Sequence, residues 1–135
     1  MSRKSILFVA LCFLSVQLVR AQEKEEVFDN AKVEVPATYP GGEQALMADV
    51  ASLVTYPEAA LARNVQGVCL LGVKVDKDGF VSDARVRKAL SRECDAEAIR
   101  VVKLLKRFTP ARDKGRRVAV WFTVPVRFLI RDLAR

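Results

Sequence analysis

The sequence predicts an α+β domain in which two helices pack on one face of a three-stranded antiparallel sheet. An Asp-Gly turn joins two β-rich runs, a long run near the C-terminus alternates apolar with other residues, and two segments have helical spacing. A hairpin followed by a helix and a third strand closes such a sheet if the third strand returns beside the first. Both helices then cover the same face, which gives two layers around one core.

The hairpin is predicted from "VCLLGVKV" at residues 68–75 and "FVSDARVRKAL" at residues 80–90. They are joined by Asp76-Lys77-Asp78-Gly79, and an Asp-Gly turn between β-rich runs is typical of hairpins. Charged and apolar residues alternate in the second run, so one face of the sheet is expected to meet water. The two aspartates resemble the start of a calcium loop, but no closing glutamate follows, which favours a plain turn.

Residues 43–54 are predicted to form the first main helix, because their apolar residues recur on one helical face. Gly41-Gly42 before it lacks the Lys-Ser/Thr of a phosphate-binding loop, and we interpret the pair as a hinge. Pro57 suits the first position of a short alanine-rich helical turn. Residues 95–106 are predicted to form the second main helix, with Ser91 or Asp95 as its cap.

Residues 118–130 are predicted to form one long strand with a wholly apolar face. Pro125 has no N–H to donate to a neighbouring strand, so we expect this strand at an edge of the sheet. A long edge presents unpaired backbone groups to any other extended chain. The edge is therefore a candidate place for docking or self-association.

The first 21 residues have the features of a secretory signal peptide. Arg3 and Lys4 precede an apolar run that is shorter than the about 20 residues a membrane-spanning helix needs, and a cut after Ala21 fits the small-residue rule. An uncut anchor, which would keep the protein at the membrane, is the alternative. We thus expect residues 1–21 as signal peptide, residues 22–38 as a flexible leader with room for one short strand, and residues 39–132 as the domain.

Export has consequences for charge and for the cysteines. Loss of the three basic residues of the signal lowers the net charge from +7 to +4, and nucleic acid is not an expected partner of an exported protein. An oxidising compartment permits a disulfide between Cys69 and Cys94, but two small buried side chains fit the sequence equally well. The chain contains no histidine, so we expect no enzymatic activity, no metal and no cofactor.

Four motifs, in this order and spacing, resemble a known family: "YPGGEQAL", "YPEAALARNVQGVCLLGVKVDKDGFVSDARV", "CDAEAIRVVKLLKRFTPA" and "VWFTVPVRF". Together they cover residues 39 to 130 and are similar to the C-terminal domain of TonB energy transducers. The resemblance implies a periplasmic domain with the fold predicted above. Phe108-Thr109-Pro110 stands where that family usually has Trp-x-Pro, which we interpret as conservative packing.

The resemblance also implies a partner and a site. In this family an extended segment of an outer-membrane transporter adds as a strand to the edge of the last strand. The residues that match this contact region are Val118, Val120, Trp121, Phe122, Thr123, Val124, Pro125, Val126, Thr55, Tyr56 and Pro57. For each tyrosine of the two Tyr-Pro pairs, packing at a helix junction is an equally good interpretation.

The departures from the family leave alternatives open. A full transducer has a membrane anchor with a coupling histidine and a long proline-rich spacer, whereas this chain has no histidine and five prolines. We therefore expect a stand-alone domain rather than an energised transducer. One alternative is a structural envelope protein that holds peptidoglycan through the basic residues of 106–117 or forms a homodimer through its last strand; another is a small redox protein that uses Cys69 and Cys94.

Overall fold

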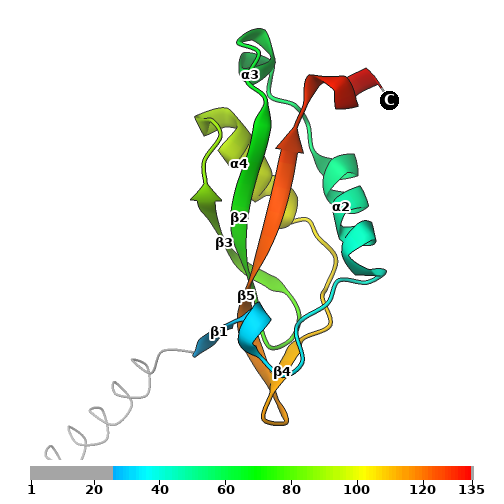
Figure 1. The fold of residues 1–135 in the computed structure, drawn as a ribbon, viewed down its shortest axis with the longest axis vertical. Helices are drawn as coiled ribbons and strands as arrows, with labels where there is room; N and C mark the ends of the chain where they lie inside the picture. The colour runs from blue at the N-terminus through cyan, green and yellow to red at the C-terminus, as the bar shows by residue number, and fades with distance from the viewer. Residues whose placement is uncertain (1–25, 135) are drawn as a thin grey trace, which may run out of the picture.

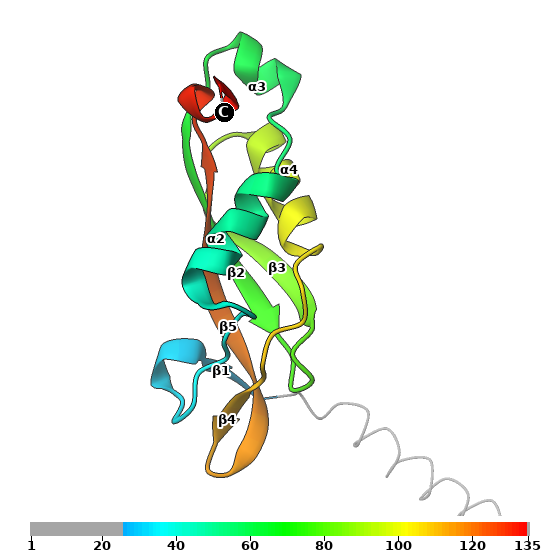
Figure 2. The ribbon, with the colours of Figure 1, turned by 90° about the vertical axis from the view of Figure 1, so that its right-hand side faces the viewer.

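The computed structural model describes residues 26–134, and the predicted signal peptide lies outside this range. The chain forms one curled sheet with helices on one side (Figures 1 and 2). In chain order the elements are β1 (Val27–Asp29), η1 (Asn30–Lys32), α2 (Gly42–Leu53), α3 (Glu58–Ala62), β2 (Gly67–Val75), β3 (Val81–Lys88), α4 (Arg92–Val102), β4 (Ala111–Asp113), β5 (Arg116–Phe128) and η2 (Ile130–Ala134).

The three long strands have the predicted arrangement. β2 lies in the middle and pairs antiparallel with β3 and with β5, so the third strand does return beside the first. Two short strands extend the sheet: β4, which was not predicted, forms a hairpin with β5, and β1, for which the leader had room, pairs with β5 in parallel. The sheet is therefore mixed and has the order β1-β5-β2-β3, with β4 off this path.

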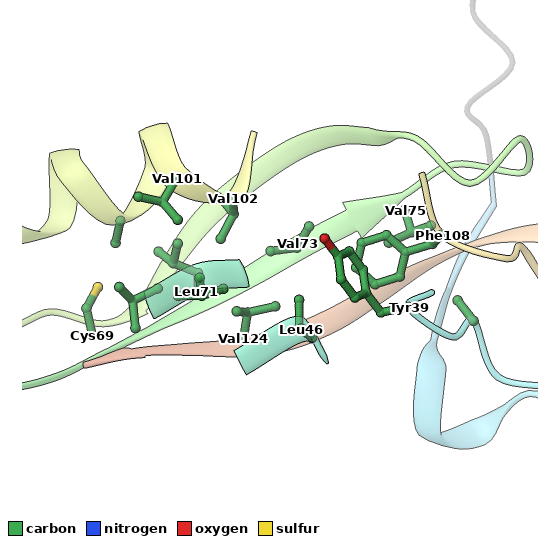
Figure 3. Packing of buried hydrophobic residues seen from close by; sticks show 14 of the residues in the cluster. Tyr39, Leu46, Cys69, Leu71, Val73, Val75, Val101, Val102, Phe108 and Val124 are labelled. Atoms are coloured by element: carbon green, nitrogen blue, oxygen red, sulfur yellow. The ribbon is translucent and has the colours of Figure 1, made fainter. Parts of the chain in front are cut away.

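The helices α2 and α4 lie on the same face of the sheet, as expected (Figure 2). The core between the layers takes every second residue of β2, and Leu71, Val73 and Val75 have no exposed surface. The facing residues of β5 include Val120 and Val124, which are equally buried. Figure 3 shows Leu71, Val73 and Val124 near Leu46 of α2, with α4 on the same side of the sheet. The other face of the sheet is left open by α2 and α4, as the alternation in β3 predicted.

Both main helices depart slightly from their predicted bounds. The first runs from Gly42 rather than residue 43, and the second begins three residues before Asp95 and ends before residue 106. The early start has a clear cause, because the Ser91 hydroxyl accepts a hydrogen bond from Cys94 N–H at 3.2 Å and caps the helix. The Asp95 carboxylate instead accepts a bond from the backbone N–H of Leu90 at 2.9 Å.

The leader is more ordered than the expected flexible segment. Its residues 26–38 contain β1 and η1, and Val33 and Ala37 are buried at 8% and 2% exposure. Backbone bridges join Val35 to Arg112 and Thr38 to Thr109. The amino-acid composition did not predict that the leader packs on the domain. The segment is held mainly by backbone hydrogen bonds, which do not depend on hydrophobic side chains.

The turn between β2 and β3 is an Asp-Gly turn, as predicted, and it also contacts the rest of the domain. One Asp76 carboxylate oxygen accepts bonds from the backbone N–H groups of Asp78 and Phe80, both at 2.9 Å. Gly79 has a φ of +91°, and its carbonyl accepts a bond from Phe108 N–H at 2.8 Å. The Asp76 carboxylate thus has a structural role in the turn, which agrees with the interpretation as a plain hairpin.

Gly79→Ala should destabilise the domain strongly. A Cβ at this position would lie 2.0 Å from the Phe108 carbonyl oxygen, and the backbone already has a conformation that L-residues avoid. We expect the free energy of unfolding to fall by more than about 2 kcal/mol, measured by urea denaturation.

Gly115→Ala is the matched control. Gly115 has a φ of +75° in the β4–β5 turn, but a Cβ there would meet nothing within 4 Å. Its cost should be limited to the backbone conformation, about 1–2 kcal/mol. Equal losses in the two variants would show that the contact between the turn and Phe108 contributes nothing.

Candidate functional site

The outer edge of β5, the side away from β2, is covered over only part of its length. On this side β1 pairs with residues 119–121, whereas β4 pairs with residues 116–118, beyond the part of β5 that pairs with β2. From Phe122 to Phe128 no strand among residues 26–134 pairs with this side. The predicted open edge of 118–130 is therefore too long, because β1 of the leader pairs with residues 119–121.

A groove runs beside the uncovered part of this edge. Figure 1 shows α2 alongside β5 on the side away from β2, and the groove between them has a volume of about 570 Å³. Most of the lining side chains are apolar. The lining residues are Met47, Ala48, Val50, Ala51, Ser52, Val54, Tyr56, Pro125, Arg127, Phe128, Leu129, Asp132 and Leu133.

Tyr56 closes one end of the groove and is also a packing residue. Its ring meets the Phe128 ring edge-on, with 5.7 Å between the centroids. Its hydroxyl donates a hydrogen bond to the Val65 carbonyl and lies 3.5 Å from the Phe128 carbonyl oxygen. Burial raises the pKa of Tyr56. Tyr56 can therefore pack inside the domain and, from the same position, contact a partner in the groove.

The chain before Tyr56 is fixed to α4 by a carboxylate and a guanidinium. Glu97 accepts a bond from Thr55 N–H at 2.6 Å and is bound by two nitrogens of Arg100, at 2.6 and 2.8 Å. Arg100 also donates to the Leu53 carbonyl at 3.0 Å, which satisfies a group at the end of α2. These contacts hold the segment that leads into the groove wall.

Tyr39 of the first Tyr-Pro pair has a structural role at the other end of α2. Its hydroxyl donates to Asp49 at 2.6 Å and accepts from Lys106 N–H at 3.2 Å. Its ring packs edge-on against Phe108, with the centroids 5.1 Å apart (Figure 3). Gly41 and Gly42 then both take positive φ, and Gly42 begins the helix, which is the predicted hinge.

The predicted contact residues divide into four groups. Tyr56 and Pro125 line the groove, and Phe122, Thr123, Val124 and Val126 belong to the uncovered edge. Val120, Val124 and Val126 are fully buried, so their side chains are not available to a partner. The backbone edge is covered at Val118, Val120 and Trp121, while Thr55 and Pro57 lie outside the groove lining.

The wall formed by α2 was not predicted as part of the site. Met47, Ala51 and Val54 lie three or four residues apart, and this spacing places them on one stripe of the helix. Met47 and Val54 are only half-buried, although both are apolar. That stripe is visible in the sequence, but its position beside β5 depends on tertiary packing.

Cys69 and Cys94 are both buried and are free thiols in this structure. Burial, together with Asp95, raises the pKa of Cys69 to about 12, so this thiol is protonated at neutral pH. A protonated thiol is a poor nucleophile. Their surroundings therefore do not resemble those of an exposed redox cysteine.

The basic residues between 106 and 117 are partly engaged within the domain. The Lys106 ammonium lies 3.8 Å from Asp49, Arg107 donates to the Asp78 carbonyl at 2.6 Å, and Arg117 lies 3.6 Å from Asp78. A second hollow of about 680 Å³ borders the β4–β5 turn, and it contains acidic residues as well as basic ones. Its lining consists of Glu26, Phe28, Lys77, Asp113, Lys114, Arg116, Arg117, Val118 and Ala119.

The fold and the groove define an α+β domain with an exposed strand edge, a class that suits binding of extended chains. A family model described as "Gram-negative bacterial TonB protein C-terminal" matches residues 52–130, more than half of the chain. The chain therefore belongs to the TonB C-terminal family, as its motifs suggested.

The solution structure of the TonB C-terminal domain of Helicobacter pylori is similar, with 20% identity, a TM-score of 0.47, and coverage of 64% of this chain and 90% of that one. No curated protein matches the sequence. Among the described residues, no helix is both long and apolar enough to span a membrane.

Acid should weaken the contact between Glu97 and Thr55. The bonds from Arg100, with that from Thr55 N–H, lower the pKa of Glu97 from 4.5 although burial opposes them. The carboxylate therefore contributes stability above the unfolded-state pKa, and this contribution is lost as the pH falls through the lower folded-state pKa.

Glu97→Gln should accordingly flatten the fall in unfolding free energy between pH 6 and pH 3, measured by urea denaturation at each pH. Glu58→Gln serves as control, since Glu58 is exposed at the start of α3. A Glu97→Gln curve parallel to that of the unmodified protein would contradict the assignment.

Proposed function

We propose that this protein binds extended segments of outer-membrane transporters, or of other envelope proteins, by strand addition in the periplasm. The observation that carries the proposal is the unpaired edge of β5 at residues 122–128 beside an apolar groove. Membership of the TonB C-terminal family supports it, because domains of this family interact with such transporters. Export would depend on residues 1–21.

The geometry suits a short strand rather than a helix. An added strand would form backbone hydrogen bonds with β5, which supply affinity without regard to sequence. Side chains on one face of that strand would point toward α2, where Met47 and Ala51 offer apolar contact. Alternate residues of the partner would thus provide specificity.

The direction in which the backbone N–H groups of this edge point can be inferred from Pro125. Pro125 lies opposite Leu70 of β2, and a proline nitrogen facing β2 would cost a bond in the central ladder. We therefore infer that the nitrogen of Pro125 faces away from β2. N–H groups two residues apart point to the same side of a strand, so the N–H of Thr123 is expected to face the groove.

An NMR titration tests the binding and its place together. Peptides from the N-terminal plugs of outer-membrane transporters should shift the amide signals of residues 122–128 and of α2, and leave those of β3 unchanged. An absence of shifts in the folded protein with all such peptides would overturn the proposal. Shifts caused by peptidoglycan fragments alone would favour the structural role in the envelope.

Thr123→Pro should abolish this binding, because it removes the N–H that is expected to face the partner. Thr123→Ala keeps the N–H and loses only an exposed side chain, so it should bind within about twofold of the unmodified protein. Amide signals of the core residues Leu71 and Val73 report whether each variant is folded. Retained binding by a folded Thr123→Pro variant would contradict the assigned edge.

A further inference from the structure

The face of the sheet that α2 and α4 leave open carries one tryptophan in contact with two arginines. The guanidinium carbons of Arg85 and Arg87 lie 5.0 and 5.2 Å from the centroid of the Trp121 ring. Both arginines belong to β3 and the tryptophan to β5, with β2 between these strands. The two side chains therefore reach across β2 to stack on the ring, an arrangement stabilised by cation–π attraction.

Gly72 provides the room for this arrangement. It lies in β2 between the inward-pointing Leu71 and Val73, so a side chain at this position would point to the open face. A Cβ there would lie 2.5 Å from Nε of Arg87. A side chain at this position would therefore displace the Arg87 side chain, which occupies the space above Gly72.

No carboxylate in the described part of the chain forms an ion pair with the Arg87 guanidinium. Asp83 pairs with Arg85 at 3.3 Å, and Asp132 lies 3.9 Å from Arg127. The carboxylate of Asp29, opposite Trp121 in β1, accepts from Ala31 N–H. No ion pair within residues 26–134 involves Arg87, whose guanidinium offers five N–H donors in a fixed fork.

The surroundings of Arg87 combine positive charge with apolar surface. Lys88 lies opposite Leu70 in the register of β2 and β3, and Leu70 lies opposite Pro125 of β5. Leu70 and Pro125 are half-buried, whereas Arg87 and Lys88 are exposed. We call Leu70, Arg85, Arg87, Lys88, Trp121 and Pro125 the arginine–tryptophan face.

We propose that the arginine–tryptophan face binds an acidic polypeptide segment, with a glutamate or aspartate carboxylate held by Arg87. A guanidinium already stacked on a ring loses little freedom on binding, and its fork matches a planar carboxylate in a bidentate pair. Because guanidinium groups already stack on the Trp121 ring, a sugar could not use that ring surface without displacing them. The apolar Leu70 and Pro125 suit the aliphatic parts of a peptide.

This site and the groove beside α2 share only Pro125, which borders both. The groove lies on the helix-covered side of β5, whereas the arginine–tryptophan face points away from the helices. Failure of either proposal would leave the other intact. Binding at each is read out by different residues.

Trp121 is the only tryptophan of the chain, so its fluorescence reports directly on this face. A glutamate-rich peptide should change the emission in a saturable way that weakens with added salt, and the same peptide with glutamine in place of glutamate should not. Arg87→Gln should weaken the binding roughly tenfold, since it removes a charge-assisted pair. Gly72→Ala should weaken it similarly by displacing Arg87.

Lys103→Gln is the matched control, because it removes one positive charge from the C-terminal end of α4, on the helix side of the sheet. Far-UV circular dichroism checks that each variant is folded. Three results would overturn the proposal: equal responses to the two peptides, equal weakening by Arg87→Gln and Lys103→Gln, or a response to anionic cell-wall glycans without one to the glutamate-rich peptide.

Discussion

The rest of the domain depends on the backbone hydrogen bonds and ring contacts of Phe108 and Thr109. Phe108 N–H binds the Gly79 carbonyl, and Thr109 exchanges two backbone hydrogen bonds with Thr38, at 2.8 and 3.2 Å. The Phe108 ring also packs against Tyr39 and against Phe122. One short segment thereby fixes the β2–β3 turn, the leader, the start of α2 and the middle of β5. Because the leader is held here, β1 covers β5 up to Trp121 and leaves the edge bare beyond it.

The tyrosines of the two Tyr-Pro pairs have the same packing role at opposite ends of α2. Tyr39 packs edge-on against Phe108 before the helix, and Tyr56 packs in the same manner against Phe128 after it. Each hydroxyl is bonded within the domain, so the buried Tyr39 and the half-buried Tyr56 leave no polar group unsatisfied. Tyr56 and Phe128 both line the groove, so the second of these contacts forms part of its wall.

Much of the fold could be predicted from the sequence, because the alternation in β2 and β5 and the Asp-Gly turn are local patterns. The extent of the open edge could not be predicted. It depends on β1, which has only three residues and is held by backbone pairing that side-chain periodicity does not reveal. Pro125 did indicate the right part of the edge, since a proline constrains its own strand. The α2 wall was missed because an apolar stripe does not say which neighbour it faces.

The two edges of the sheet show why only one of them suits an added strand. The outer edge of β3 also has no partner strand among residues 26–134, but β3 carries Asp83, Arg85, Arg87 and Lys88 within eight residues. Such charges discourage pairing with another chain. The uncovered part of β5 has a proline, one arginine and buried valines instead, with an apolar helix wall beside it. Charge is thus concentrated at the β3 edge and on the adjoining open face, which suits contacts between side chains, while the β5 edge is left for contacts between backbones.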